Sequence, residues 1–316
     1  MSGPIILLGP QRPTPNLTEI LADLPGEGPV LTITAGWRYD ESDRESLDAA
    51  IGAGAEPLPL YRWFDEIVGE APDLARAYKE RQRLVRKLKS LYRLRLKHAM
   101  DTVHALMERR VEDPELVEPE LEAALEVVRE IDESYLIRST AIQMGSRHQL
   151  RALETPRVAR RRTEAARRIL EARAVLIAGG HVAVLRNRLM FFELDFALRQ
   201  AVQRGTALIG WSAGAMVLTE RVVLFYDDPP EGHSYPELLD RGLGLVSGIV
   251  ALPHAKRRLN LEDSDRIGAL AARFESSACV CMENGAHLVG RDGFWENRGA
   301  PDTALLMSVD GSVDPL

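Results

Sequence analysis

Residues 207–216 read Ala-Leu-Ile-Gly-Trp-Ser-Ala-Gly-Ala-Met, and this stretch decides how the rest of the chain can fold. A short apolar run ends in Gly-x-Ser-x-Gly and continues into residues that favour helices, which is typical of a buried strand that turns sharply into a helix. Ser212 stands at the apex of that turn, and the amide of Ala213 behind it can donate to a developing oxyanion. The pattern predicts a nucleophilic serine. A plain strand–turn–helix connection with a small capping serine has the same local sequence and stays open.

Strands alternate with helices on both sides of this stretch. Short apolar runs that read as strands lie at 4–8, 29–34, 56–61 and 174–178, and segments with helical spacing separate them. Such alternation implies a parallel sheet that helices cover on both faces. We therefore expect an α/β fold with three layers, α/β/α, around a mainly parallel, flavodoxin-like sheet. The loop Gly9-Pro10-Gln11-Arg12, after the first strand, can face a ligand.

The alternation stops at residues 72–153, where no strand pattern occurs. Apolar residues step by threes and fours through two segments, of which the first is rich in Lys and Arg and the second in Glu. We expect a large all-helical insertion, a helical hairpin at 72–153, in an α/β hydrolase core formed by 1–71 and 154–316. Its apolar stripe is too long to stay in water. The hairpin is therefore expected to cover the active-site edge or to form the interface of a homodimer.

Two further residues with side chains suited to catalysis follow the ends of predicted strands. His254 and Glu283 each follow a short apolar run downstream of Ser212. In open parallel sheets the ligand binds at the edge where the strands end, so we expect these side chains to meet the serine there. A serine hydroxyl needs a base, and the base needs an anion that holds its tautomer. His254 and Glu283 can supply these, and Asp227, which also follows a strand after the serine, is the rival orienting acid.

Composition argues against several classes of protein. The chain has 316 residues and a formal charge of −7, which argues against nucleic acid as a main partner. We find no signal peptide and no apolar run of the ~18 residues that would cross a membrane. Cys279 and Cys281 stand at alternate positions of one predicted strand, which makes a poor disulfide and fits the cytoplasm. The histidines lack the spacing of a zinc site, so we expect no metal and no cofactor.

Several motifs together resemble a known family. They are Gly210-Trp211-Ser212-Ala213-Gly214-Ala215, the strand that ends in Gly179-Gly180, and the strand that ends in His254 with Arg257 and Arg258 after it. These motifs are similar to the serine peptidase family of aspartyl dipeptidase and cyanophycinase. The resemblance implies a fold like that of class I glutamine amidotransferases and a Ser212-His254-Glu283 triad. It also implies that the substrate is a small peptide or amide, cleaved at a peptide or isopeptide bond next to an acidic residue.

The same resemblance implies how the site is completed. The amides of Gly180 and Ala213 would form the oxyanion hole, and candidate substrate-binding residues are His181, Asp227, Arg257 and Arg258. We expect Arg258 to bind a substrate carboxylate through a two-pronged hydrogen bond.

The chain also departs from this family, and other functions stay open. His181-Val182 follow the Gly-Gly pair, where family members usually carry Asn or Asp-Gln, and Leu252-Pro253 precede His254, where cyanophycinases carry Asp-Gln. These differences leave substrate specificity undetermined. They favour an alternative, a non-catalytic interaction protein that binds through its helical insertion. An esterase of the α/β-hydrolase kind would need Asp227 as its acid, and a glutamine amidotransferase would need Cys at position 212.

Overall fold

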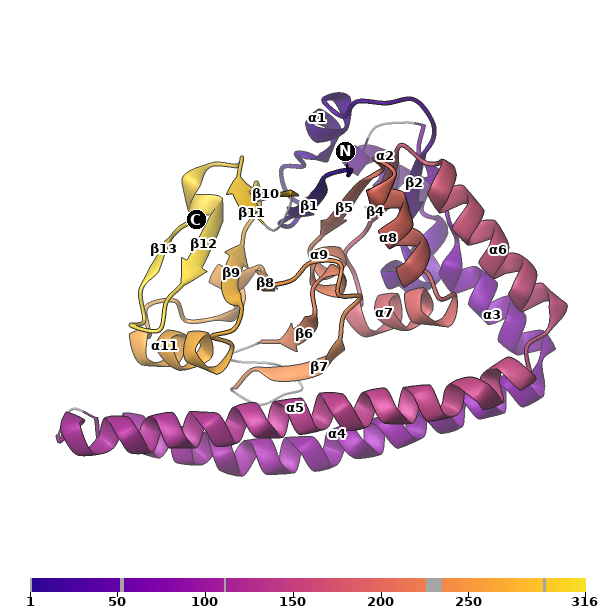
Figure 1. Cartoon of the computed structure of the whole chain (residues 1–316). Coiled ribbons are helices and arrows are strands. Elements are labelled where there is room, and N and C mark those ends of the chain that lie inside the picture. Colours follow the sequence, from indigo (N-terminus) through magenta and orange to yellow (C-terminus); the bar gives the residue numbers. More distant parts are fainter. Residues whose placement is uncertain (1, 52–53, 111, 226–234, 292–293) are drawn as a thin grey trace.

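The computed structural model describes residues 2–51, 54–110, 112–225, 235–291 and 294–316. A central sheet carries helices on both faces, a smaller sheet packs at one side, and two long helices run beneath the whole (Figure 1). The predicted α/β class with a large helical region is confirmed. None of the described helices is long and apolar enough to span a bilayer.

The central sheet has the strand order β11-β10-β1-β5-β4-β2-β3. Strands β1 to β5 run parallel, whereas β10 is antiparallel to β1 and β11 is antiparallel to β10. This order differs from that of flavodoxin, because β1 lies beyond β5 instead of beside β2. Apolar runs identify strands but do not say which strands are neighbours. The strand bounds are Ile5–Leu8 (β1), Val30–Ile33 (β2), Glu56–Pro57 (β3), Ala174–Ile177 (β4), Ala207–Trp211 (β5), His287–Arg291 (β10) and Phe294–Asn297 (β11).

Alternate side chains of these strands enter two separate cores. In β4, Val175 and Ile177 belong to the larger core, whereas Ala174 and Leu176 belong to the smaller one. The smaller core includes α1 (Leu17–Ala22) and α2 (Arg44–Ile51), which follows the 3-10 helix η1 (Ala35–Ser42). The larger core includes α3 (Leu60–Glu70), α6 (Pro156–Glu171), α7 (Val182–Phe191), α8 (Asp195–Gln203) and α9 (Ala213–Leu218). Two helical layers therefore enclose the sheet, as the sequence predicts.

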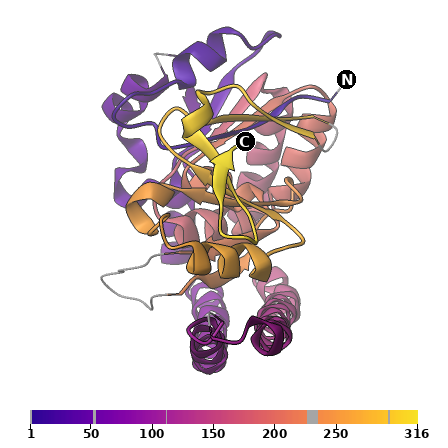
Figure 2. The same cartoon turned by 90° about the vertical axis from the view of Figure 1, so that its left-hand side faces the viewer.

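A second sheet, with the order β13-β12-β9-β8, packs beside the first (Figure 2). Strands β8 (Ile249–Pro253) and β9 (Ala278–Met282) are parallel, and β12 (Ala304–Met307) and β13 (Val313–Pro315) are antiparallel to their neighbours. Where the sheets meet, a Cβ at Gly9 would lie 1.8 Å from the carbonyl oxygen of Glu283. Glycine is therefore required there for close approach. The helices α10 (Ala255–Arg258) and α11 (Ser264–Arg273) connect β8 to β9, and the 3-10 helix η2 (Pro301–Thr303) precedes β12.

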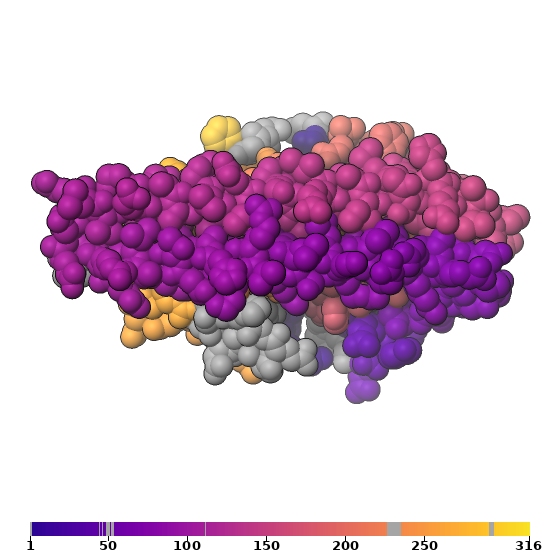
Figure 3. Space-filling view, turned by 90° about the horizontal axis from the view of Figure 1, so that it is seen from below, coloured from indigo at the N-terminus to yellow at the C-terminus, as the bar shows by residue number. Residues whose placement is uncertain are grey.

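The helices α4 (Pro72–Met107) and α5 (Pro114–Ala152) form an antiparallel hairpin along one side of the molecule (Figure 3). The ring of Tyr92 stacks on that of Tyr135 with 4.3 Å between the centroids, which fixes how the two helices align. A two-stranded ribbon of β6 (Arg221–Leu224) and β7 (Glu237–Arg241) lies between this hairpin and the central sheet (Figure 1).

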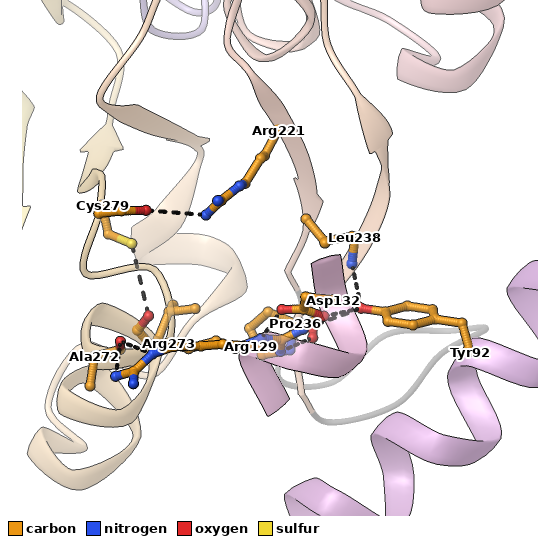
Figure 4. Close-up of polar contacts among 11 residues, drawn as sticks. Tyr92, Arg129, Asp132, Arg221, Pro236, Leu238, Ala272, Arg273 and Cys279 are labelled. Carbon is orange, nitrogen blue, oxygen red and sulfur yellow. Dashed lines mark hydrogen bonds and ion pairs between the residues drawn. The ribbon is translucent and has the colours of Figure 1, made fainter. Parts of the chain in front are cut away.

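A buried ionic cluster ties the hairpin to the second sheet (Figure 4). The Arg273 guanidinium of α11 donates two hydrogen bonds of 2.7 Å to the Asp132 carboxylate of α5. The Tyr92 hydroxyl of α4 donates to Asp132 over 2.8 Å and accepts from the amide of Leu238 in β7 over 3.0 Å. Because a buried charge is costly unless it is paired and hydrogen-bonded, this set holds four elements in one arrangement.

Candidate active site

Ser212 lies at the junction of β5 and α9, in a strained backbone conformation. Its φ is 49° and its ψ is −117°, a region that residues with a Cβ rarely adopt. The Ser212 amide donates to the carbonyl oxygen of Leu8 over 3.1 Å, and its own carbonyl accepts from the amide of Met216 over 3.1 Å. The main chain is thus fixed on both sides, and the half-buried hydroxyl is left to face the cavity.

The glycine after the serine is required by close packing. A Cβ at Gly214 would lie 1.9 Å from the carbonyl oxygen of Ile177 at the end of β4. The first turn of α9 therefore passes directly over the neighbouring strand. This contact explains why Gly-x-Ser-x-Gly, rather than any strand–turn–helix sequence, occurs here.

His254 reaches the serine from the second sheet. It follows β8 with a φ of 61° and a ψ of 34°, and its amide donates to the carbonyl oxygen of Met282 over 3.0 Å. Its Nε2 lies 3.5 Å from the Oγ of Ser212. This is the long limit of a hydrogen bond, as is common for catalytic contacts before substrate binds. Burial, and then the charges of Arg258 and Arg257, lower the pKa of His254 and so favour the neutral imidazole that can accept a proton.

A cavity of about 640 Å³ opens over this pair. The predicted residues Gly180, Ser212, Ala213, His254 and Arg258 all line it. The predicted ligand-facing loop after β1 also lines it, through Pro10, Gln11 and Arg12. The lining residues that the sequence did not predict include Trp37, Asp40 and Asp43, which come from η1 and the residue after it. The only signal for them is that they follow the end of β2, the same edge at which Ser212 stands.

The candidate oxyanion donors lie beside the serine. Gly180 has a φ of 114°, and a Cβ on its neighbour Gly179 would be 3.1 Å from the Cβ of Ser212. The Gly179-Gly180 turn therefore passes next to the nucleophile. Ala213 begins α9, so its amide is one of those that the helix leaves unpaired.

The other candidate substrate residues lie elsewhere. His181 caps α7: its Nδ1 accepts from the amide of Val184, and its own amide donates to the carbonyl oxygen of Gly36 over 2.8 Å. It is exposed and does not line the cavity. Arg257 is also exposed and outside the cavity. Asp227 lies outside the described residues.

Glu283 lies near the pair but bonds to a different group. Its carboxylate accepts the amide of Lys256 over 2.7 Å, and its own amide donates to the carbonyl oxygen of Thr303 over 2.8 Å. Within the described residues, no hydrogen bond joins Glu283 to His254. The sequence analysis expects a direct contact with the imidazole. In the structure, the turn after β8 places a backbone N–H in front of the carboxylate instead.

The expectation that these groups meet at the edge of one sheet is wrong. Ser212 follows β5 in the central sheet, whereas His254 and Glu283 follow β8 and β9 in the second sheet. The strands β8 and β9 have the apolar runs of a parallel pair, but among the described strands they pair only with each other and with antiparallel β12. No group of three or more His, Cys, Asp or Glu side chains that could hold a metal ion occurs in the described part of the chain.

The segment that contains Ser212, His254 and Glu283 is similar to a known family of proteins. Residues 140–295 match the model of peptidase family S51, which includes aspartyl dipeptidase and cyanophycinase. The matched residues make up just under half of the chain, and over them the chain is similar to peptidase family S51. The match spans α7, the serine elbow, His254 and Glu283, and it confirms the family that the motifs resemble. It also identifies the chain as a hydrolase of the peptidase kind.

One solved structure, a peptidase, supports the fold. The crystal structure of a peptidase from an acI-B1 Actinobacterium aligns with 98% of this chain and 92% of its own, at 15% identity and a TM-score of 0.51. The 1.5 Å crystal structure of a putative peptidase E protein from Listeria monocytogenes EGD-e aligns with 95% of this chain and 100% of its own, at 11% identity and a TM-score of 0.45. No curated protein sequence matches the chain significantly.

Proposed function

We propose that the chain is a serine peptidase that cleaves a peptide or isopeptide amide bond with Ser212 as the nucleophile and His254 as the base. The observation that carries the proposal is the 3.5 Å approach of Ser212 Oγ to His254 Nε2 in a cavity of about 640 Å³. A cavity of this size accommodates a short peptide segment. The strained backbone of Ser212 is a further sign of function, because strain of this kind persists at sites where chemistry needs it.

Each step of the reaction has a group to perform it. The neutral His254 takes the proton of the Ser212 hydroxyl as the oxygen attacks the carbonyl carbon, and returns it to the leaving amine. The amides of Gly180 and Ala213 stabilise the oxyanion of the tetrahedral intermediate. Water then attacks the acyl-enzyme with His254 again as the base, and Ser212 is released.

Glu283 orients His254 through the main chain in this proposal. Its bond to the Lys256 amide holds the turn that begins at His254. The left-handed backbone of His254 needs such support, since a non-glycine residue at positive φ is strained. Asp227 remains the rival acid for a direct contact with the imidazole.

Arg258 gives the site its preference for an acidic residue next to the scissile bond. It lines the same cavity as Ser212, and its guanidinium lies 5.5 Å from the centre of the Phe225 ring. A guanidinium binds a carboxylate by two parallel hydrogen bonds, each stronger than a bond between neutral groups. Contacts of this kind contribute roughly 1.5–3 kcal/mol in total, which corresponds to about a ten- to hundred-fold preference.

A fluorophosphonate probe tests the mechanism directly. We expect the probe to label wild-type protein at Ser212 and to leave Ser212→Ala and His254→Ala unlabelled. A protein that stays unlabelled at high probe concentration would instead favour the interaction protein that keeps this fold without catalysis. Specificity is then measured as kcat/KM on paired peptides that carry Asp or Asn beside the scissile bond, in wild type and in Arg258→Met. An equal Asp preference in both proteins removes Arg258 from this role.

A further inference from the structure

The outer face of the hairpin carries exposed leucines. In α4, Lys89 and Arg93 contact Glu237 of β7, so they mark the side of the helix that faces the body of the molecule. Leu91 is two positions from each, which places it about 200° away around the helix. Leu84 and Leu94, seven residues before and three after Leu91, lie on the same face. The exposed fractions of Leu84, Leu91 and Leu94 are 36%, 48% and 56%.

The outer face of α5 carries small residues beside these leucines. The Arg129 guanidinium donates to the carbonyl oxygen of Ala272 and so marks the body side of α5; Val127, two residues earlier, lies opposite and is exposed. Further along this face come Ser134, Ala141 and Gly145. An added Cβ at Gly145 would meet no atom within 4 Å. Together α4 offers a leucine ridge, defined as Leu84, Leu91 and Leu94, and α5 offers a small-residue row, defined as Ser134, Ala141 and Gly145.

This face is large enough for a stable interface. A helix of 36 residues is about 54 Å long, and two adjacent helices are about 20 Å wide, so the face covers roughly 1,000 Å². A standard protein–protein interface buries about 800 Å² on each partner. None of the described residues that line the active-site cavity comes from the hairpin, so this surface is separate from the candidate active site. Figure 3 shows that the two helices together form most of this side of the molecule.

The charges of the two helices say which partner fits. The helix α4 has ten Lys and Arg residues and three acidic ones, whereas α5 has eight acidic residues and four arginines. Lys87 and Arg95 flank the leucine ridge, and no ion pair links either to another described residue. Glu130, an exposed residue of α5, is likewise without an ion pair among the described residues. A mainly basic helix therefore lies beside a mainly acidic one, and a second copy of the same hairpin can bring the two kinds of helix together.

We propose that two copies of this chain associate through their hairpins as a four-helix bundle. Two arrangements bring the faces together. A two-fold axis across the helices would place α4 on α4, so that Lys87 and Arg95 of each copy would lie against the same basic helix of the other. A two-fold axis parallel to the helices places each α4 on the partner's α5, so that the leucine ridge packs into the small-residue row. Lys87 and Arg95 then face the negative helix that carries Glu130 of the partner subunit, and the charges select this arrangement.

The oligomeric state tests the proposal. We expect wild-type full-length protein to sediment as a dimer at micromolar concentration, and Leu91→Glu to raise the dissociation constant by at least ~100-fold, since it would bury two unpaired carboxylates. The matched control is Phe196→Glu in α8, which alters another exposed apolar residue (67% exposed) off this face and should leave the dimer intact. Circular dichroism confirms that both variants keep their helices. A wild-type monomer at every concentration, or a Leu91→Glu dimer as tight as wild type, would falsify the proposal.

Cross-linking then tests the orientation. Because Tyr92 stacks on Tyr135, Leu94 and Ser134 lie at nearly the same level of the hairpin. We expect a mixture of Leu94→Cys chains and Ser134→Cys chains to form disulfide-linked dimers, whereas either variant alone forms few. The native Cys279 and Cys281 are buried and do not interfere. Efficient self-linking of Leu94→Cys alone would show that α4 packs on α4 and would overturn the proposed arrangement.

Discussion

Ser212 and His254 approach each other from two different sheets, with 3.5 Å between Oγ and Nε2, and both residues have a positive φ, of 49° and 61°. Non-glycine residues are uncommon in this region because the Cβ is crowded there. The neighbouring strands hold each residue in place, because the Ser212 amide donates to Leu8 of β1 and the His254 amide donates to Met282 of β9. Two independently strained turns therefore direct two reactive side chains at one point, which is difficult to explain by packing alone.

The first prediction concerns the nucleophile. Ser212→Ala should lower kcat by roughly 10³- to 10⁶-fold, as loss of a catalytic serine does in other hydrolases. The melting temperature should change little, because the main-chain bonds of Ser212 do not involve the hydroxyl. The measurement is turnover of an Asp-containing peptide together with thermal unfolding. Turnover at the wild-type rate in the purified variant would exclude Ser212 as the nucleophile.

The second prediction separates two ways in which Glu283 can act. The Lys256 amide needs only an acceptor, so Glu283→Gln should keep most of the activity, whereas Glu283→Ala should lower kcat by roughly 10- to 100-fold with little change in KM. Asp227→Asn is measured beside them. If Glu283→Gln is as inactive as Glu283→Ala, the carboxylate charge acts on His254 itself. If Asp227→Asn alone is inactive, the orienting charge comes from that position.

The third prediction concerns pH. The acid limb of kcat/KM reports the protonation of His254 in the free enzyme and should lie below the ordinary histidine pKa of about 6.5, because burial and the charges of Arg258 and Arg257 lower the pKa of His254. A cation opposes protonation of the ring, so Arg258→Met should raise this pKa and move the limb to higher pH. Arg257→Met should move it in the same direction by less. A limb that stays in place in Arg258→Met would mean that the guanidinium does not act on His254.

The fourth prediction concerns the buried ionic cluster. Arg273→Met leaves the Asp132 carboxylate buried with only the Tyr92 hydroxyl, and should reduce the free energy of unfolding by about 3–5 kcal/mol. Arg273→Met combined with Asp132→Asn should recover part of this loss, since no buried charge remains unpaired. Urea denaturation measures the free energy of unfolding of the single and the double variant. The control is Arg221→Met, which removes an exposed hydrogen bond to Ser276. A double variant less stable than Arg273→Met would show that the cluster stabilises by more than pairing.

The fifth prediction concerns how Lys89, on the side of the hairpin that faces β7, makes stability depend on pH. Burial lowers the pKa of Lys89 to about 8, against about 10.4 in an unfolded chain. Between these values the unfolded chain binds the proton and the folded chain does not, so stability should rise with pH from about 8 to 10.4. Lys89→Met should abolish this rise and cost little, because Glu237 keeps its two hydrogen bonds to Arg93. Melting temperatures of both proteins from pH 7 to 10 provide the measurement.

The elbow could be predicted from the sequence because its signal is local. Gly210, Ser212 and Gly214 act within five residues, and the close contact that needs glycine follows directly from the turn. The hairpin could be predicted for the same reason, since helical spacing repeats along each segment. Helical spacing at 182–204 does not reveal that this segment forms two helices, α7 and α8, because Glu193 between them adopts a φ of 54° that no local pattern indicates.

What could not be predicted depends on distant segments. The partner of Glu283 is a backbone amide of Lys256, and its position depends on a turn after another strand. Asp40 and Asp43 enter the cavity only because η1 folds back over the sheet edge. The division into two sheets depends on pairing between distant segments, since β9 lies between β8 and β12 in a sheet separate from the central one.

That division also sets when the site can form during synthesis. The serine, its elbow and the parallel strands around it come from the first 218 residues, but His254 is held by a sheet that includes β12 and β13, at 304–315. A ribosome-bound chain therefore has its nucleophile about ninety residues before it has a base beside it. In the proposed mechanism, hydrolysis needs the second sheet, because β8 and β9 of that sheet hold His254. Completion of the second sheet during synthesis is therefore the step that brings the base to the nucleophile.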